Sequence, residues 1–406
     1  MTQSGGAAAD FAPYLYGVDA YFNYVNNTLH GVNGRKIDLA YPLDDESNPT
    51  TDITDARTLV TTDHAFAIVG VATALFGGST YLSKSGVPTF GYVTGPVWQG
   101  PSNFFGDYGS VIDYQTSLPQ FAYAVKQLKA KNVAVIALNY PSSQDECEPA
   151  IKDFKKDFGI NVAYSNVDEP LFTANFSTDV TKMIDDHVDM IISCMDAGND
   201  IALTKEMQDQ GMATVPQVWV DGYDRTLLSK EASYMQDVYL LIQHVPFEAG
   251  QEYPATFPGL QLYFNQMKSY FESAYPSNYN SYLPYTYDDV ALMGWESANL
   301  FTEGLRVAGK NPTQKAVITA INKITDDVGG PTGDGVATPT NWTIAHTKDT
   351  PPACISFVET TGTSDPSTAS FKLVFNKGSD PWICFPLTGK INLAKPVAPP
   401  KGTPGA

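Results

Sequence analysis

The stretch from Gly31 to Tyr92 constrains the fold most, because its apolar runs alternate between the spacing of strands and that of helices. Phe66–Val71 is a continuous apolar run bounded by turn residues, which is typical of a strand buried on both faces. Strands that alternate with helices predict a parallel sheet with right-handed crossovers. The pattern predicts strands over Ile37–Tyr41, Phe66–Val71 and Thr89–Val93, and helices over Thr51–Thr61 and Leu75–Ser85.

The ligand site of such a sheet is expected beyond the carboxyl ends of its strands. Three loops follow the predicted strands: Asp44–Asn48, Ala72–Gly78 and Tyr92–Gly95. We therefore expect these loops to share one rim and to carry the site.

A second block of the same pattern runs from about Leu118 to His244. Three long helices follow it without strands of their own, so we expect them to return and cover the first domain. The end of the chain is strand-like and closes in a Pro-rich tail, residues 396–406, which we expect to be disordered. The second block predicts strands over Val133–Leu138, Val162–Tyr164, Met190–Cys194, Gln217–Val220 and Tyr239–His244, with helices over Leu118–Leu128, Pro149–Phe158, Phe176–Asp185 and Ile201–Gln210; the later helices are Leu260–Tyr275, Asp288–Val307 and Thr313–Ile324.

Length and composition indicate a two-domain globular protein. The chain has 406 residues, 43% of them hydrophobic and 17% charged, which is too long for one core and too apolar for general disorder. A net charge of −19 argues against nucleic acid and anionic membranes as partners, because both require clustered Lys and Arg. No run of 18 apolar residues suggests a membrane span.

The beginning of the chain lacks two expected features. A small-residue loop and a helix from about Ala12 to Asn26 open the sequence, with no charged and apolar leader of the signal-peptide type. A sheet of this kind needs a strand before its first helix. We expect that strand, and an export signal, upstream of Met1; the alternative is that Met1 is the true start and another segment fills the position.

The cysteines and histidines show no metal or catalytic spacing. Cys354 and Cys384 lie in two strand-like runs and could form a cross-strand disulfide; Cys147 and Cys194 could pair as well or remain buried thiols. Neither C-x-x-C nor H-E-x-x-H occurs, and no G-x-S-x-G, P-loop or G-x-G-x-x-G motif is present. We expect no metal, no cofactor and no enzymatic activity.

The chain resembles the type I periplasmic solute-binding proteins, the group that includes the leucine/isoleucine/valine-binding protein. The resemblance covers nearly the whole length. The motifs that carry it are Gly31–Ile37 (GVNGRKI), Asp44–Pro49 (DDESNP), Ile68–Gly70 (IVG) and Gly86–Pro88 (GVP), with weaker ones at Tyr287–Val290 and Pro351–Cys354.

The resemblance implies an α/β fold of two doubly wound, Rossmann-like lobes that close over a ligand in the manner of a Venus flytrap. A three-segment hinge would join the lobes, with crossings near Gly109–Tyr114, Gln243–Pro246 and Gly330–Thr338. Lobe one would comprise residues 1–112 and 246–332, and lobe two residues 113–245 and 333–406.

In lobe one, the family holds a ligand carboxylate with a Ser hydroxyl, backbone amides and a Thr. The matching positions are Thr73, Ala74 and Leu75, together with Thr94. Ala74 stands where the family has Ser, so Thr73 and the amides at the start of the helix near Leu75 would have to substitute. Ordinary capping is the alternative role of Thr73 and Thr94.

In lobe two, the family supplies an aromatic residue and an acid that binds the ligand's ammonium group. Asp221 occupies the position of the acid, and Asp196 is a second rim acid. A turn aspartate before Gly222 is the alternative role of Asp221. We expect Gln144 near the family's aromatic position, and aromatic walls from Tyr92, Trp98, Tyr140 and Tyr223, unless these rings pack between loops.

The resemblance implies an extracytoplasmic solute-binding protein that delivers a small ligand to an ABC importer. Asp221 favours an amino acid or another amine-bearing compound. The expected partners are this ligand and the ABC permease subunits, with the protein itself a monomer. Two alternatives are a sensing module of the same fold and a hydrolase built on this scaffold.

Overall fold

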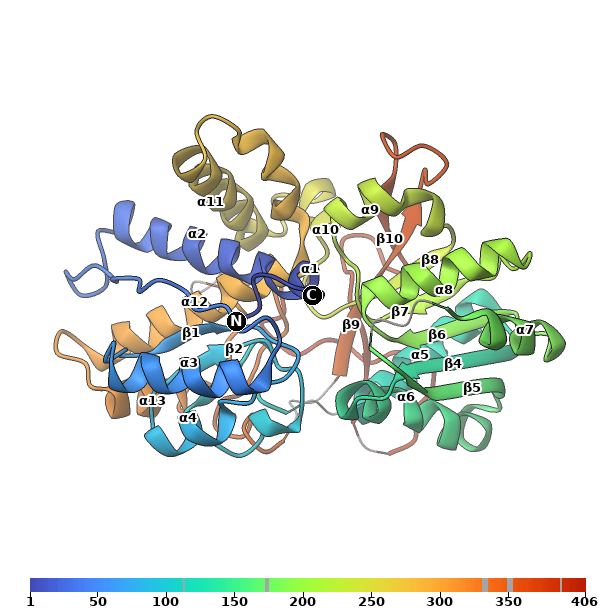
Figure 1. Cartoon of the computed structure of the whole chain (residues 1–406), viewed down its shortest axis with the longest axis horizontal. Helices are drawn as coiled ribbons and strands as arrows, with labels where there is room; N and C mark the ends of the chain where they lie inside the picture. The colour runs from blue at the N-terminus through green and yellow to red at the C-terminus, as the bar shows by residue number, and fades with distance from the viewer. Residues whose placement is uncertain (112–113, 172–174, 331–334, 349–352, 388) are drawn as a thin grey trace. The chain divides into compact units, whose positions relative to one another are not determined.

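The computed structural model describes residues 1–111, 114–171, 175–330, 335–348, 353–387 and 389–406 (Figure 1). Its contacts divide the chain into two compact units. The first unit comprises Met1–Ile112, Pro254–Thr350 and Lys401–Pro404, and the second comprises Asp113–Tyr253, Pro351–Pro400 and Gly405–Ala406. Parts of two predicted crossings (112–113 and 331–334) and of one family motif (351–352) lie outside the described residues.

The first unit is built on a small parallel sheet in the order β1-β2-β3. Asn48 caps α3 through its side chain, and Asp288 caps α12 in the same way, which explains where these two helices begin. The strands are β1 (Ile68–Val71), β2 (Thr89–Gly91) and β3 (Phe104–Gly106); the helices are α1 (Ala8–Phe11), α2 (Pro13–Asn27), α3 (Pro49–Thr61), α4 (Ser79–Ser85), α11 (Pro258–Ala274), α12 (Asp289–Ala308) and α13 (Gln314–Ile321), with short 3₁₀ turns at Pro96–Trp98, Tyr279–Ser281 and Leu283–Tyr287.

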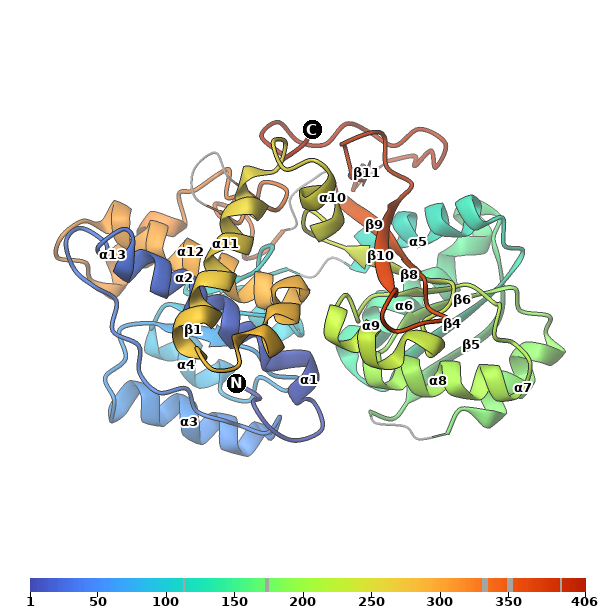
Figure 2. The ribbon, with the colours of Figure 1, turned by 90° about the horizontal axis from the view of Figure 1, so that it is seen from above.

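Helices cover both faces of this sheet (Figures 1 and 2). Helices α2 and α12 lie on one face, where Phe301 packs against Phe22 and Phe90. Ala56 of α3 and Leu82 of α4 bury the other face with the sheet residues Ile68 and Phe104. The prediction that the late helices return to the first domain is confirmed, because α11 and α12 both pack on α2.

Two predicted elements of the first unit are wrong. Ile37–Tyr41 forms neither strand nor helix, and Tyr41 is 87% exposed. Helix α4 begins at Ser79, four residues later than predicted, because the chain after β1 first turns through Gly77 and Gly78. A Cβ at Gly77 would lie 2.3 Å from the carbonyl oxygen of Pro49, so only glycine permits this close approach of the backbone.

The second unit contains a larger mixed sheet in the order β10-β9-β8-β7-β6-β4-β5, with β11 paired to β9. Five neighbouring strands are parallel, whereas β9, β10 and β11 pair in antiparallel fashion. The strands are β4 (Asn132–Leu138), β5 (Asn161–Glu169), β6 (Met190–Cys194), β7 (Gln217–Trp219), β8 (Val238–Ile242), β9 (Ala353–Thr361), β10 (Ser370–Val374) and β11 (Ile383–Phe385).

Alternate residues of β4 enter two different cores. Val133 and Val135 pack with α5 and α6, while Ala134 and Ile136 pack with α7 and α8. This arrangement explains the continuous apolar run of a strand that is buried on both faces. The helices are α5 (Tyr114–Leu128), α6 (Pro141–Asp153), α7 (Ser177–Asp185), α8 (Ala197–Asp209), α9 (Arg225–Glu231) and α10 (Phe247–Glu252), with a π-helical turn at Phe154–Phe158 and a 3₁₀ turn at Ala232–Tyr234.

All four cysteines are paired. Cys354 lies directly opposite Cys384 in the antiparallel β9–β11 ladder, with Cα atoms 4.0 Å apart. Cys147 of α6 is joined to Cys194 at the end of β6, with Cα atoms 6.0 Å apart. Cys147 and Cys194 are therefore not free thiols, and the alternative considered for them is wrong.

Two chain segments lie elsewhere than the sequence suggested. Residues 335–348, assigned above to lobe two, belong to the first unit, where Trp342 packs against Phe105. The C-terminal tail was expected to be disordered, but Val397 pairs with Cys384 and the Thr403 side chain is buried. In the described ranges, no helix combines the length and the apolar character needed to cross a bilayer.

Candidate functional site

The second unit has a topological switch point between β4 and β6. After β4 the chain runs through α6 to β5 on one side, and it later returns to β6 on the other side of β4. Ligand sites of open α/β sheets lie at such points, outside the carboxyl ends of the strands. The loops that begin at Asn139 and Met195 flank this point, and the loop after β7 lies next to them.

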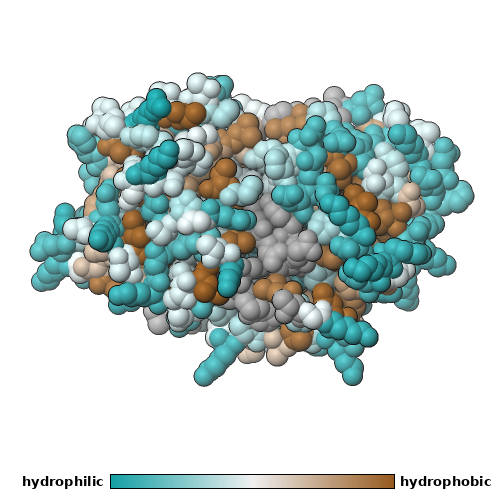
Figure 3. All heavy atoms as spheres, turned by 90° about the horizontal axis from the view of Figure 1, so that it is seen from below, coloured by the Kyte–Doolittle hydropathy of each residue, from teal (hydrophilic) through white to brown (hydrophobic). Residues whose placement is uncertain are grey.

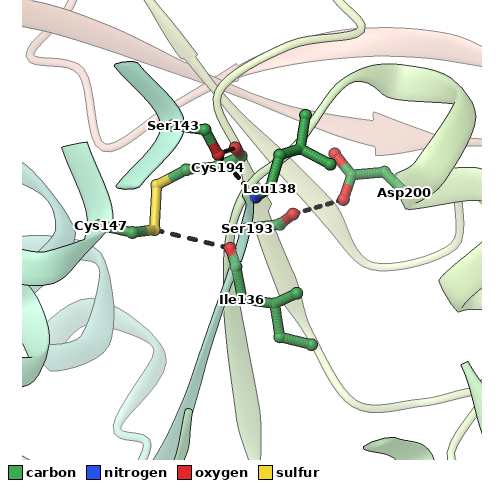
Figure 4. Close-up of a disulfide and its surroundings, with 7 residues drawn as sticks. All are labelled: Ile136, Leu138, Ser143, Cys147, Ser193, Cys194 and Asp200. Atoms are coloured by element: carbon green, nitrogen blue, oxygen red, sulfur yellow. Dashed lines mark hydrogen bonds between the residues drawn. A yellow bond between two sulfur atoms is a disulfide. The ribbon is translucent and has the colours of Figure 1, made fainter. Parts of the chain in front are cut away.

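Ser143 and a disulfide hold the two strands together at the switch point (Figure 4). The Ser143 hydroxyl accepts a hydrogen bond from the Leu138 amide at 2.8 Å and donates one to the carbonyl oxygen of Cys194. The disulfide between Cys147 and Cys194 adds a covalent link between α6 and β6. These contacts make the rim a preorganised platform, and no pattern in the sequence singles out Ser143.

Asp196 follows β6 and caps helix α8. One of its carboxylate oxygens accepts the backbone N–H of Asn199 at 3.0 Å, and the other accepts the Asn199 side chain. The residue remains partly exposed. Capping is thus one role that the structure shows for Asp196, and it keeps a negative charge at the rim.

Asp221 lies two residues beyond β7 and is also partly exposed. Its carboxylate accepts the backbone N–H of Gly222 at 2.7 Å. Burial, and to a smaller extent the negative charge of Asp196, raise the pKa of Asp221 to about 6, although the backbone N–H groups of Gly222 and Ala197 oppose the rise. In the described part of the chain, neither Asp196 nor Asp221 forms an ion pair, so the rim holds two neighbouring acids without a basic partner.

Tyr140 and Gln144 lie on the loop and helix that follow β4. Tyr140 is half-buried against the α7–α8 core, and burial raises its pKa. Gln144 donates its side-chain N–H to the carbonyl oxygen of Val167 at 2.8 Å, which ties α6 to β5. Tyr140 therefore stands beside the switch point, whereas the Gln144 amide is engaged within the unit.

Tyr223 does not form an aromatic wall at the rim. The side chain is 1% exposed and stacks on Phe247, with ring centroids 5.1 Å apart. Its hydroxyl donates to Glu248 and accepts the Phe247 amide at 2.8 Å. The ring thus packs against Phe247 of α10 and Phe371 of β10, so packing is the role that the structure shows for it.

Thr73 and Thr94 of the first unit belong to a network of hydroxyl groups at the end of β1. Thr73 is 1% exposed and accepts a hydrogen bond from Thr2 at 3.2 Å, while Thr94 donates to the carbonyl oxygen of Thr73 at 3.0 Å. Thr2 also donates to Asp45 at 2.7 Å. Sequence reasoning placed Asp45 in a rim loop but could not predict its bond to Thr2, because this bond joins residues 43 positions apart.

The other predicted residues of the first unit have different environments. Trp98 is fully buried in the core between Phe76 and Phe104, so it lines no surface. Leu75 is 37% exposed, but its amide does not start a helix, because α4 begins only at Ser79. Ala74 and Tyr92 are partly exposed at the same rim.

The structure therefore brings Tyr140, Asp196 and Asp221 to adjoining strand ends of the second unit. It places Ala74, Tyr92 and Thr94 at the corresponding edge of the first unit's sheet. Within the described residues, His, Cys, Asp and Glu side chains form no group of three that could hold a metal ion.

Comparison with known proteins identifies the family to which the chain belongs. A family model described as periplasmic binding protein matches residues 1–362. The sequence itself matches no curated protein significantly.

Several solved structures share the fold. A branched-chain amino acid ABC transporter protein from Thermus thermophilus with bound valine is 15% identical, with a TM-score of 0.70, and the match covers 92% of this chain and 93% of that one. A fatty acid ABC transporter substrate-binding protein from Thermomonospora curvata is 16% identical (TM-score 0.69; 99% and 94% covered). A solute-binding protein from Rhodopseudomonas palustris in complex with p-hydroxybenzoic acid is 17% identical (TM-score 0.68; 88% and 90% covered). With a family model that matches most of its length, this chain belongs to the periplasmic binding protein family.

Proposed function

We propose that this protein is an extracytoplasmic solute-binding protein of an ABC importer and that its ligand carries an amine, as amino acids do. Family membership supports the transport role, and the solved structures of the same fold include proteins with bound valine and with bound p-hydroxybenzoic acid. The ligand class therefore has to be inferred from this chain's own residues.

The observation that carries the proposal is the acid pair at the carboxyl ends of β6 and β7. The negative charge of Asp196 helps to raise the pKa of Asp221, and neither acid forms an ion pair among the described side chains. An ammonium group placed between them would relieve this repulsion and form charge-assisted hydrogen bonds. A ligand that carries only a carboxylate would add a third negative charge, so benzoates and fatty acids are disfavoured.

The proposed mechanism has three steps. The amine end of the ligand binds at the rim of the second unit, and its other end meets the rim residues Ala74, Tyr92 and Thr94 of the first unit. Ligand binding then shifts the equilibrium toward a closed form, and the size of the shift equals the difference between the ligand's affinities for the closed and the open form. The closed form docks on the permease subunits of the importer.

The ligand class is tested by a thermal-shift screen of amino acids, amino-acid amides, benzoate and medium-chain fatty acids. An amine-bearing compound at about 100 times its Kd should add roughly 2.7 kcal/mol of stability. Stabilisation by benzoate or a fatty acid, without any response to amines, would overturn the ligand class.

The role of Asp221 is tested by measuring ligand affinity in the Asp221→Asn variant. Removing one charge of an ammonium–carboxylate pair should weaken binding by about 2–5 kcal/mol. Asp237→Asn is the matched control, because Asp237 lies just before β8, at the opposite edge of the same sheet. The control should bind like the unmodified protein, and equal affinities in all three proteins would exclude Asp221 from the site.

The pH dependence gives an independent measurement. Since the pKa of Asp221 is raised to about 6, its carboxylate is ionised at pH 7.5 and protonated at pH 5. Affinity for an amine should therefore be constant above pH 7 and fall by roughly tenfold per pH unit below about 6. In Asp221→Asn this dependence should be absent.

A further inference from the structure

The strand ends of the first unit offer few donors for a carboxylate. The loops that follow its strands, residues 72–78, 92–95 and 107–111, contain no Lys, Arg or His. A carboxylate bound there would depend on hydroxyl and backbone N–H groups, because an anion taken out of water needs hydrogen bonds or a cation.

Three of the donors at this rim are buried or engaged within the unit. Thr73 is buried, and Thr94 donates its hydroxyl to the carbonyl oxygen of Thr73 at 3.0 Å. The Gly78 amide, just before α4, donates to the Asp52 carboxylate at 2.7 Å, and Asp52 is itself buried. An acid of the chain thus already occupies the place that an external anion would take at the start of α4.

The strand ends of the second unit carry an excess of acids. Asp196 follows β6, Asp221 follows β7, and Asp224 caps α9. Burial raises the pKa of Asp221 most, and the negative charges of Asp196 and Asp224 raise it further. A cation placed among these three carboxylates would lower their mutual repulsion.

Neighbouring basic residues do not offset these acids. The loops 139–140, 195–196 and 220–224 contain no Lys, Arg or His. Arg225, the next residue of the chain, forms an ion pair with Glu248 at 3.2 Å. His244, which follows β8, is buried, and burial lowers its pKa to about 4, so it is uncharged at neutral pH.

A fourth acid, Asp200, lies in the first turn of α8. The residue is fully buried; one carboxylate oxygen accepts the Ser193 hydroxyl, and the other has no hydrogen-bond partner in the described structure. Figure 4 shows this second oxygen pointing away from Ser193, on the side of Leu138, the last residue of β4. Burial, and then the negative charges of Asp196 and Asp221, raise the pKa of Asp200. A positive charge at the strand ends would favour its ionised form as well.

We propose that the ligand is a cationic amine without a carboxylate, such as an alkylamine, a diamine or an amino-acid amide, and that α-amino acids are poor ligands. This inference rests on the proposed function, because it narrows the amine class named there. The positive charge of such a ligand is attracted by the acids of the second unit. The carboxylate of an amino acid would offset this attraction and would require donors that the first unit uses itself.

Calorimetric titration with two matched series of compounds tests the proposal. Leucine, leucinamide and 3-methylbutylamine form one series, and lysine, lysinamide and 1,5-diaminopentane form the other. Each amide has nearly the size of its amino acid but lacks the negative charge, so it separates the effect of charge from that of shape.

In the series that binds more tightly, the amide and the amine should bind about tenfold or more tightly than the amino acid. Equal affinities, or tighter binding of the amino acid, would overturn this inference and leave the proposed function standing. If none of the six compounds binds, the inference and the amine ligand class both fail.

The Asp196→Asn variant tests the electrostatic reason. Asparagine also caps helices, so the start of α8 is retained while one negative charge is removed. The amide should lose more affinity than the amino acid, because the ammonium attraction falls for both and the carboxylate repulsion falls only for the amino acid. Asp237→Asn, the control described above, should change neither affinity. Equal losses for both compounds in Asp196→Asn would overturn the inference.

Discussion

At the scale of single residues, several acids of this chain are buried, among them Asp200, Asp288 and Glu296. Asp107 follows β3 and accepts hydrogen bonds from Tyr14 at 2.6 Å and from Ser297 at 3.1 Å. Its other carboxylate oxygen is buried without a hydrogen-bond partner in the described structure. Burial raises the pKa of Asp107 to about 8, and burial likewise raises the pKa of the nearby Glu296.

Asp107 should make the protein less stable as the pH rises. In the unfolded chain its pKa is near 3.9, so between pH 4 and 8 only the folded state holds the proton. The free energy of unfolding should then decrease with pH, by at most about 1.4 kcal/mol per unit. Asp107→Asn removes this contribution, and the advantage of the variant over the unmodified protein should grow between pH 6 and 8.

Urea unfolding at several pH values measures this difference. Asp365→Asn serves as control, because Asp365 is exposed and hydrogen bonds from Ser367 lower its pKa. Glu296 keeps some pH dependence in the Asp107→Asn variant. A constant difference between the two proteins from pH 6 to 8 would contradict the assignment.

At the scale of elements, the first unit depends on the close packing of α2 against α12. Gly17 of α2 faces Ala291, and Gly294 of α12 faces Tyr14. A Cβ at Gly17 would lie 1.7 Å from the carbonyl oxygen of Ala291, and one at Gly294 would lie 2.0 Å from that of Tyr14. The two helices therefore approach through their backbones, and this sets the position of α2 on β1.

Gly17→Ala should destabilise the protein by about 2 kcal/mol or more. Alanine favours a helix over glycine by about 1 kcal/mol, but the forced separation of two packed helices costs more. Gly198→Ala in α8 is the control, since its one close contact is with the Asp196 side chain at 3.0 Å. Chemical unfolding measures the free energy of unfolding of both variants. Similar small losses of stability in the two would show that α2 and α12 adjust freely.

At the scale of the whole molecule, the excess of acids dominates. The net charge is −19, and hydrophilic residues occupy most of the surface seen in Figure 3, with apolar residues in small separate patches. Among the described residues, most ion pairs involve exposed side chains, which contribute little to stability. Repulsion among like charges therefore opposes the compact state.

Added salt should stabilise the protein. Raising NaCl from about 0.01 to 0.15 M shortens the Debye length from roughly 30 to 8 Å, which screens this repulsion. We expect the melting temperature to rise by a few degrees over this interval and to level off beyond it. A melting temperature that falls with NaCl would mean that attractive charge pairs outweigh the repulsion.

The order of the elements and the resemblance to the periplasmic binding proteins could both be predicted from the sequence. Continuous apolar runs such as Met190–Cys194 specify strands with helices on both faces, and helical spacing located α3 and α12 to within a few residues. Asp196 and Asp221 could be found because each lies two residues beyond the carboxyl end of a buried strand, where the ligand sites of open α/β sheets lie. Such features depend on local periodicity alone.

The burial of individual side chains and the pairing of strand edges, by contrast, depend on the folded arrangement of the chain. Trp98 and Tyr223 follow strands just as Tyr140 does, yet both are buried. The rings of Phe76 and Phe104 pack on Trp98, and the ring of Phe247 packs on Tyr223. Ile37–Tyr41 has the composition of a strand, but a ladder needs a partner, and the position between it and β1 is a cavity. Burial and pairing are properties of residues brought together from separate parts of the chain, so no local pattern encodes them.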